Sequence, residues 1–480
     1  RRTLTEDLRP LGISVAAAGS AFEEDPYELN LLQSSDGVVV ATPEKLDLLL
    51  RSHPEWFTDL RLVIVDEAHL MQDKERGARL ELLLANLRRE QPDARLLLLT
   101  PFMDNAKEVA EWLSRERPGT VSVHWRPTRI LLGMAKIAGA GKNRSLSVSW
   151  KDPYSPDKAP RPLVMPTNVK AKDVGSNLQR TLFLADTFKD LGTALALFSA
   201  SPADAEDAAV RHADLRPLIP SDRRRPELRV AIALARHEFG SESRLAHCLQ
   251  RGVAFHHSSL SPILRYLIED QVRDGVLSFV AATSTLAQGM NFPVATIVVH
   301  SVHKPYGGGN FTSSEFWNMA GRAGRVGMVE KGLVLFADPK HQQHLDRYSK
   351  SLTESLRSAL LLIVDQIQLN QPLKDMYREH ATLRPFIQYL AHAAARSSPS
   401  DAIANLEALI QQSLVNQQVA NSAQAQKLRA VARKYLQEIL AKPGSMIKAA
   451  DTTGLGTFSF DQLYARLRED PILREGPRHV

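Results

Sequence analysis

A chain of 480 residues is too long for one hydrophobic core and predicts two or three domains. Its composition, 44% hydrophobic and 24% charged, is typical of a globular protein, and the absence of a signal-like start or a run of about eighteen apolar residues excludes a membrane protein and indicates the cytoplasm. The single Cys248 excludes an internal disulfide, and the net charge of +6 permits an anionic partner such as nucleic acid.

Strand-like and helix-like segments alternate between Gly37 and about Leu113, which is the pattern of a parallel sheet with helical crossovers. In chain order the segments are GVVVAT, PEKLDLLLRS, RLVIVDEAH, ARLELLLANLRRE and ARLLLLT. They predict a doubly wound α/β lobe within residues 1–130.

The third of these segments runs directly into two carboxylates. Residues 62–65 are apolar and predict a strand buried on both faces, so Asp66 and Glu67 lie at its carboxyl end, where open α/β sheets bind ligands. Two acids in this place favour phosphoryl transfer, in which one holds Mg²⁺ through water and the other orients or deprotonates an attacking water. A solvated Asp-Glu turn is the alternative.

The composition changes between about Arg126 and Arg180, where Pro, Lys, Ser and Gly are frequent. A stretch such as KDPYSPDKAPRPLVMP can bury little surface. Residues 131–180 are therefore predicted to form a linker or an exposed insertion.

A second alternation predicts a second lobe over residues 181–345, with strands in TALALFSAS, GVAFHH, GVLSFVAATSTLAQG, ATIVVHS and KGLVLFAD. One helix between these strands is well defined, because Ser261 can cap it, Pro262 suits its first turn and Gly275 can end it. Its expected apolar stripe consists of Ile263, Leu264, Leu267, Ile268 and Val272.

Beyond about His341 the sequence has helical patterns only, so residues 346–480 are predicted to form a helical accessory region. The chain begins with Arg inside an apparent helix and stops after an amphipathic segment. We therefore expect it to be a piece of a larger protein.

The segment EFWNMAGRAGRVG contains two arginines, Arg322 and Arg325, three residues apart. On a helix they would lie one turn apart on the same side. Guanidinium groups stay charged and donate hydrogen bonds in pairs, so the two arginines would form a fork suited to phosphate oxygens. Pairing with surface acids is the structural alternative.

Five motifs occur in order along the chain: VVVATPEKLDLLL, VIVDEAH, VAFHHSSL, VAATSTLAQGMNFP and FWNMAGRAGRVG. This series, within about residues 36–338, resembles the DEAD/DEAH-box helicases of superfamily 2, specifically the Ski2-like group. The resemblance implies two RecA-like lobes with doubly wound parallel sheets, the first incomplete here, and a helical end that includes a winged helix and a helical domain. It also implies ATP and Mg²⁺ between the lobes and a single-stranded or partly duplex nucleic acid across both.

The resemblance assigns a role to each matching residue. Asp66 would hold Mg²⁺ through water, Glu67 would be the catalytic base, and His69 would couple the ATP site to the nucleic acid. Arg322 and Arg325 match the paired arginines of the family, and Arg325 is the expected finger on the γ-phosphate. The other residues expected at the nucleotide are Gly289, Asn291 and Asn318. Those expected at the strand backbone are Thr42, Pro43, Glu44, Lys45, Thr283, Ser284 and Thr285.

The sequence departs from the family pattern in three places. Thr100, Pro101 and Phe102 replace the usual Ser-Ala-Thr, so that of the two hydroxyls only that of Thr100 survives, and they put in doubt the coupling of hydrolysis to strand separation. Asn318 replaces the usual Gln. The sequence also contains no GxxxxGK[ST] phosphate loop. Its nearest look-alike, AGAGKN at residues 138–143, lacks the first Gly and the final Ser/Thr, and follows the DEAH strand instead of preceding it.

The leading hypothesis is a fragment of an ATP-dependent helicase or translocase that moves 3′-to-5′ on a single strand, with the fragment inactive by itself. One alternative is a catalytically dead nucleic-acid-binding scaffold, which the change at residues 100–102 favours. Another is a split ATPase whose phosphate loop lies on a second polypeptide. The sequence upstream in the gene would separate the three.

Overall fold

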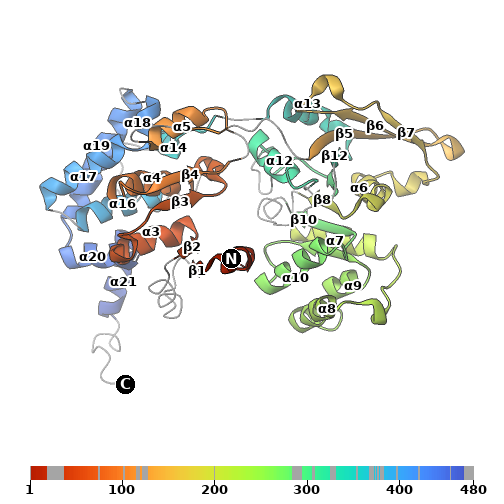
Figure 1. Cartoon of the computed structure of the whole chain (residues 1–480), viewed down its shortest axis with the longest axis horizontal. Coiled ribbons are helices and arrows are strands. Elements are labelled where there is room, and N and C mark those ends of the chain that lie inside the picture. The colour runs from red at the N-terminus through yellow and green to blue at the C-terminus, as the bar shows by residue number, and fades with distance from the viewer. Residues whose placement is uncertain are drawn as a thin grey trace. The chain divides into compact units, whose positions relative to one another are not determined.

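The computed structural model describes residues 2–18, 37–73, 76–100, 103–114, 119–121, 128–198, 201–283, 294–304, 309–324, 331–352, 355–366, 372, 375, 378, 383–395, 398–419, 422–453 and 456–469 (Figure 1). The chain forms two compact units. Unit 1 comprises Arg1–Val121 and Ser355–Val480, and unit 2 comprises Ser122–Glu354. The chain therefore leaves unit 1 once and returns to it.

Unit 2 is built on an eight-stranded sheet with the order β7-β6-β5-β12-β11-β8-β10-β9 (Figure 1). The strands are β5 (Arg129–Ala138), β6 (Ser145–Lys151), β7 (Leu163–Pro166), β8 (Ala194–Phe198), β9 (Val253–His256), β10 (Phe279–Thr283), β11 (Thr296–Val299) and β12 (Lys331–Phe336). The five strands predicted for the second lobe, β8 to β12, are contiguous and parallel. Every residue of β8 and β10 is buried, which explains their continuous apolar sequence and confirms the doubly wound α/β class.

The helices of unit 2 are α6 (Asn177–Thr187), α7 (Pro202–Ala213), α8 (Pro226–Phe239), α9 (Arg244–Leu249), α10 (Pro262–Arg273), α12 (Ser313–Ala320) and α13 (Gln342–Lys350). Helix α10 is the helix predicted to begin after Ser261, whose hydroxyl accepts a hydrogen bond from the Leu264 amide. Ile263 was expected in its apolar stripe, but it is exposed, because the buried face follows the four-residue spacing of Leu264, Ile268 and Val272.

The structure differs from the expected linker or exposed insertion at residues 131–180. Strand β5 pairs parallel with β12, and β6 and β7 extend the sheet antiparallel from β5. Leu132, Leu146 and Val148 are fully buried. The Pro- and Lys-rich stretch between β6 and β7 dominated the composition of this region and concealed the apolar residues that flank it.

Unit 1 contains two pairs of parallel strands, β1 with β2 and β3 with β4. Its first elements are α1 (Arg2–Leu8), β1 (Ser14–Ala18), β2 (Gly37–Ala41), α3 (Pro43–Ser52), β3 (Leu62–Val65), α4 (Gly77–Glu90), β4 (Arg95–Leu98) and α5 (Ala106–Leu113). The alternation predicted from Gly37 onward is confirmed in order and type. The DEAH acids directly follow β3, as expected.

The carboxyl-terminal part of unit 1 is helical, as predicted, and is drawn in blue in Figure 1. Its helices are α14 (Ala359–Gln366), α16 (Arg384–Ala395), α17 (Pro399–Gln411), α18 (Leu414–Val419), α19 (Ala423–Leu440), α20 (Gly444–Thr453) and α21 (Thr457–Glu469). Helices α14, α16 and α17 pack against α4, and α20 packs against α3. The described residues between 355 and 469 contain no strand, so no β-wing is observed there. Among the helices described, none is long and apolar enough to cross a membrane.

A chain of buried charges joins the α/β part of unit 1 to these helices. Asp47 on α3 accepts hydrogen bonds from Arg51 at 2.8 Å and from Arg79 of α4 at 3.3 Å. Arg51 also donates to the main-chain oxygen of Asp451 on α20, at 2.9 Å, and lies 3.3 Å from its carboxylate. The same carboxylate lies 2.9 Å from Nδ1 of His392 on α16. Four helices thus share one ionic network, whose side chains are almost all excluded from water.

The His392 imidazole lies between two carboxylates, Asp451 and Glu90, the latter with its oxygen 3.9 Å from Nε2. Burial disfavours the charged imidazole, but the hydrogen bonds to these acids outweigh it and raise the pKa of His392. A pKa raised on folding means that the stabilisation is complete below about pH 6.5, the ordinary histidine pKa, and is lost as pH rises through the folded-state pKa.

We therefore expect the thermal midpoint of unit 1 to fall as pH rises from about 6.5 to 8.5. His392→Gln should remove most of this pH dependence, because glutamine does not titrate. Differential scanning calorimetry across this range measures the effect. His237→Gln is the matched control, since His237 is on unit 2. Identical pH profiles for wild type and His392→Gln would contradict the prediction.

Candidate nucleotide and nucleic-acid site

The DEAH turn follows the carboxyl end of β3 and is fixed to the end of β4. The Ala68 amide donates to the Leu99 carbonyl at 2.9 Å, and the Leu99 amide donates to Val65 at 2.8 Å. Asp66 and Glu67 are therefore held beside Leu99 and Thr100, the two residues that follow β4. This is the edge at which parallel α/β sheets present their ligand site.

Glu67 has the only positive φ of a non-glycine residue in the described part of the chain, with φ 54° and ψ 45°. A left-handed conformation costs about 1–2 kcal/mol for a residue with a Cβ atom. This cost is partly offset by a hydrogen bond that the Glu67 amide donates to Asp66 Oδ1 at 2.9 Å. Backbone strain of this kind concentrates at functional sites, because the surrounding structure must impose it.

His69 lies close to the proposed base, with Nδ1 3.3 Å from the Glu67 Oε2 atom. The imidazole is largely buried, whereas the Glu67 carboxylate is about one third exposed. Thr100 Oγ1 is buried and has no hydrogen-bond partner within the described residues. The turn therefore brings together three of the predicted groups: the acid pair, His69 and the Thr100 hydroxyl.

The carboxylate pair fits the expected magnesium chemistry. Mg²⁺ usually keeps several waters and takes only one or two protein carboxylates together with substrate phosphates. Asp66 is exposed and can serve as such a ligand through water. No cluster of three His, Cys, Asp or Glu residues suited to a metal occurs in the described ranges, so an all-protein metal cage is not indicated there.

The TPEK segment begins α3. The Thr42 hydroxyl caps this helix by accepting from the Lys45 amide at 3.2 Å, and Pro43 occupies its first turn. Glu44 forms a two-point ion pair with Arg76, at 2.9 and 3.2 Å, and these contacts lower the pKa of Glu44 against the effect of its burial. Sequence analysis did not identify Arg76, whose only signal was its position just before the glycine that starts α4.

The side chain of Lys45 is fully buried, on the same face of α3 as Leu48 and Leu49, so its ammonium does not lie at the surface. The main chain of Lys45 is then the part left for a contact with a strand, and the contact of the TPEK segment with the strand backbone stays a prediction.

In unit 2 two of the predicted residues lie at opposite ends of the parallel strands. Thr283 ends β10 and pairs with Phe198, which ends β8, so it is at the carboxyl edge. Arg322 is beside the start of β11, because its carbonyl accepts from the Val294 amide at 3.2 Å. This separation agrees with different expected partners, a strand backbone for Thr283 and a nucleotide for Arg322.

Helix α12 ends at Ala320, so Arg322 follows the helix and is not on its surface. The prediction that both arginines lie on one helix is wrong in this respect. Gly321 is the C-cap of α12, and beyond it the chain packs closely against β12, since a Cβ atom on Gly324 would lie 2.7 Å from the Gly332 amide nitrogen. Gly324 also has φ +70°, a conformation that favours glycine.

Asn318 is half-buried on α12, a helix that is firmly positioned. The neighbouring Trp317 is fully buried, and its indole donates to the Tyr348 and Ser351 carbonyls at 3.1 Å. Phe316 stacks on Tyr348 at a centroid distance of 4.1 Å. The predicted residues Ser284, Thr285, Gly289, Asn291 and Arg325 lie outside the described residues.

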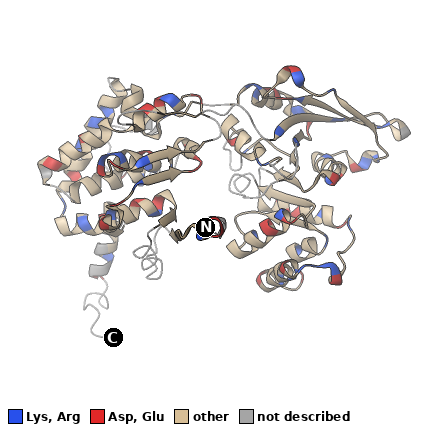
Figure 2. Cartoon of the chain, viewed as in Figure 1, with Lys and Arg blue, Asp and Glu red and all other residues tan. Residues whose placement is uncertain are grey.

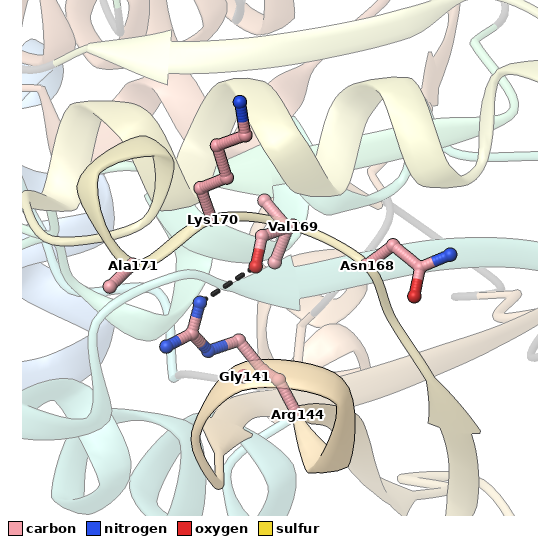
Figure 3. A pocket seen from close by; sticks show the side chains of 6 residues that line it. All are labelled: Gly141, Arg144, Asn168, Val169, Lys170 and Ala171. Carbon is pink, nitrogen blue, oxygen red and sulfur yellow. Dashed lines mark hydrogen bonds between the residues drawn. The ribbon is translucent and has the colours of Figure 1, made fainter.

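The look-alike AGAGKN forms the turn between the antiparallel strands β5 and β6. No α-helix begins there, so its amides are not arranged as in a phosphate loop. A cavity of about 430 Å³ lies beside this turn, lined by Gly141, Arg144 and residues 168–171. Figure 3 shows that Arg144 is engaged with the Val169 carbonyl, at 2.7 Å, and that Lys170 points away from it. The cavity therefore presents no converging catalytic groups.

Charges of both signs are interspersed over the helices of both units (Figure 2). The mild positive net charge is thus spread over the chain and does not define a binding surface by itself.

Comparisons with known proteins agree with the order of motifs. The model of the DEAD/DEAH box helicase family matches residues 2–109, in unit 1, and the model of the helicase conserved C-terminal domain matches residues 219–327, in unit 2. The two matches and the α/β folds of the units define the class of superfamily 2 helicases. The chain belongs to this superfamily, within its Ski2-like group.

Several curated relatives carry the name ATP-dependent DNA helicase Hel308. That of Methanocella arvoryzae is 27% identical over 439 residues, which are 89% of this chain and 55% of the relative. That of Pyrobaculum calidifontis is 31% identical over 355 residues, 73% of this chain and 46% of the relative. That of Caldivirga maquilingensis is 30% identical, with 72% and 43% covered. The chain spans about half the length of the curated relatives it matches.

Proposed function

We propose that this chain is part of an ATP-dependent helicase or translocase that moves 3′-to-5′ along a single DNA strand. The observation that supports this best is the DEAH turn, where Glu67 adopts a left-handed backbone between Asp66 and His69 at the ligand edge of the sheet. We propose DNA and not RNA as the substrate because the relatives are named as DNA helicases.

The residues of unit 1 have defined parts in the proposed reaction. ATP bound with Mg²⁺ supplies the phosphoryl group that is transferred to water. Asp66 would hold the Mg²⁺ through its water shell, and Glu67 would take the proton of the attacking water. His69, in contact with Glu67, would orient that carboxylate. In unit 2, Arg322 and Arg325 would stabilise the charge on the phosphates.

We further propose that the phosphate loop lies on polypeptide outside these 480 residues. The strand pair β3–β4 supports this, because parallel strands are normally covered on both faces. One face packs on the core through Val63, Leu96 and Leu98. The other face shows exposed fractions of 51% at Leu62, 55% at Ile64, and 45% at both Leu97 and Leu99. Such an apolar face is suited to be covered by further elements of the same lobe.

The test compares this chain with the parent protein, defined as the longer polypeptide in which the phosphate-loop region is joined to it. We expect the parent to hydrolyse ATP with strong stimulation by single-stranded DNA, and the 480-residue chain to show none. A coupled ATPase assay with and without a DNA oligonucleotide measures both proteins.

Each other outcome has a definite meaning. Stimulated turnover by the 480-residue chain, abolished by Glu67→Gln, would contradict the need for an external phosphate loop. An inactive parent that still binds DNA would favour the scaffold. Activity restored only by a separate polypeptide would favour the split ATPase.

A further inference from the structure

The chain returns from unit 2 to unit 1 at residues 355–360, which we call the return segment. Leu356, Ser358 and Leu360 are buried in unit 1. The return segment forms no strand, and only its end enters helix α14, so side chains from other elements bind its main-chain polar groups. Two of these side chains, Asn105 and Gln72, lie on the segments that follow Thr100 and Glu67.

Asn105 makes the most specific of these contacts. Its Nδ2 donates to the Leu356 carbonyl at 2.9 Å, and its Oδ1 accepts from the Leu356 amide at 2.7 Å. The carboxamide thus binds one residue through a donor and an acceptor, as a neighbouring strand would. Asn105 precedes α5, on the segment that follows β4 and Thr100.

Gln72 binds the residue before, since its Nε2 donates to the Ser355 carbonyl at 2.8 Å. Gln72 is the last residue of the 3-10 turn that begins directly after Glu67. The turn that follows Glu67 and the start of α5 therefore hold adjacent residues of the return segment.

Gln418 and Glu81 also bind the return segment, and we call these two side chains together with Asn105 and Gln72 the clamp. Gln418 donates to the Leu356 carbonyl at 2.8 Å and accepts from the Ser358 amide at 2.9 Å. The buried Glu81 carboxylate accepts from the Ser358 hydroxyl at 2.8 Å and from the Val415 amide at 3.1 Å. Through these bonds the return segment joins α4 to the carboxyl-terminal helices.

We propose that Asn105 and Gln72 are positioning residues that transmit the nucleotide state of the DEAH turn to the return segment. The covalent chain passes between the units at only two places, and this clamp fixes one of them to the elements that bear Glu67 and Thr100. A shift of either element moves its carboxamide and with it the main chain at residues 355–356. The clamp thus supplies coupling where the Thr100-Pro101-Phe102 sequence departs from the family.

This inference rests on the proposed motor function and is tested in the parent protein. Asn105→Ala removes both bonds to Leu356. We expect DNA-stimulated ATP turnover to change by less than about threefold, whereas the base pairs unwound per ATP should fall about fivefold to tenfold, in the range of single-residue effects on coupling.

Val109→Ala is the matched control. Val109 is buried on α5, the helix that Asn105 precedes, and contributes to stability, but its side chain makes no hydrogen bond to the return segment. We expect it to lower the thermal midpoint and leave unwinding per ATP unchanged. An unchanged ratio in Asn105→Ala, or an equal loss in both alanine variants, would overturn the proposal. A wild-type parent without turnover would instead refute the function on which it rests.

Discussion

Glu67→Gln in the parent protein is expected to lower DNA-stimulated ATP hydrolysis by about 10²- to 10⁴-fold, the usual contribution of a general base. Glutamine has the same size and the same cost in the left-handed conformation, so the DEAH turn should keep its shape. It removes only the ability to accept a proton from the attacking water. Binding of ATP should change little, because the phosphates and Mg²⁺ are assigned to other groups.

Single-turnover hydrolysis and equilibrium binding of a fluorescent ATP analogue separate these two effects. The variant should also retain DNA more strongly with ATP present, since the closed complex is no longer resolved by hydrolysis. Glu55→Gln is a suitable control, because Glu55 is an exposed acid of the same unit whose carboxylate lies 3.4 Å from His53 Nδ1. Turnover within about twofold of wild type would show that Glu67 is not the base and would contradict the proposed active site.

Local pattern was sufficient to predict the parallel strands and the DEAH edge. The strand β3 has no polar residue before Asp66, and the α10 helix has a cap at Ser261 and a stop at Gly275, so short-range chemistry determined these elements. The order of strands within the sheet was implied only by the resemblance to a known family. Periodicity gives the type of an element but not its neighbours.

The errors arose where tertiary contacts outweigh local signals. Lys45 lies in a motif expected at the nucleic acid, yet the packing of α3 buries it. Arg322 lies just beyond the end of α12, where Gly324 packs closely against Gly332. Strand β5 forms because β12 offers it an edge about two hundred residues later in the chain, and β6 then pairs with β5. None of these partners is visible in a local window of sequence.

The contact of the carboxyl-terminal helices with the α/β part of unit 1 could not be predicted from local sequence either. Asp47 lies four residues before Arg51 and Asp451 lies four hundred residues after it, and only the folded structure places both acids on one guanidinium. Through this pair, α20 is fixed to α3, the helix that begins with Thr42 and Glu44. The accessory helices are thus an integral part of the unit that contains the DEAH turn.

Asp47→Ala in the 480-residue chain is expected to lower the free energy of unfolding of unit 1 by about 3–5 kcal/mol, the usual cost of removing one partner of a buried ion pair. Asp47 is the shared acceptor of Arg51, Arg79 and the Tyr389 hydroxyl, so its removal leaves buried donors without their acceptor. Burial and the negative charge of Asp47 both raise the pKa of Tyr389, which keeps this phenol a hydrogen-bond donor.

Urea unfolding followed by hydrogen exchange of peptides from α3, α16 and α20 measures the loss in unit 1 alone. Tyr389→Phe should cost less, about 1–3 kcal/mol, and its effect should largely vanish in the Asp47→Ala background, because the hydroxyl then has no acceptor to lose. Asp59→Asn is the control, since Asp59 is 93% exposed and should change the free energy by less than about 0.5 kcal/mol. A loss for Asp47→Ala as small as that of Asp59→Asn would mean that the ionic network does not hold the accessory helices to α3, and their attachment would then depend on apolar packing alone.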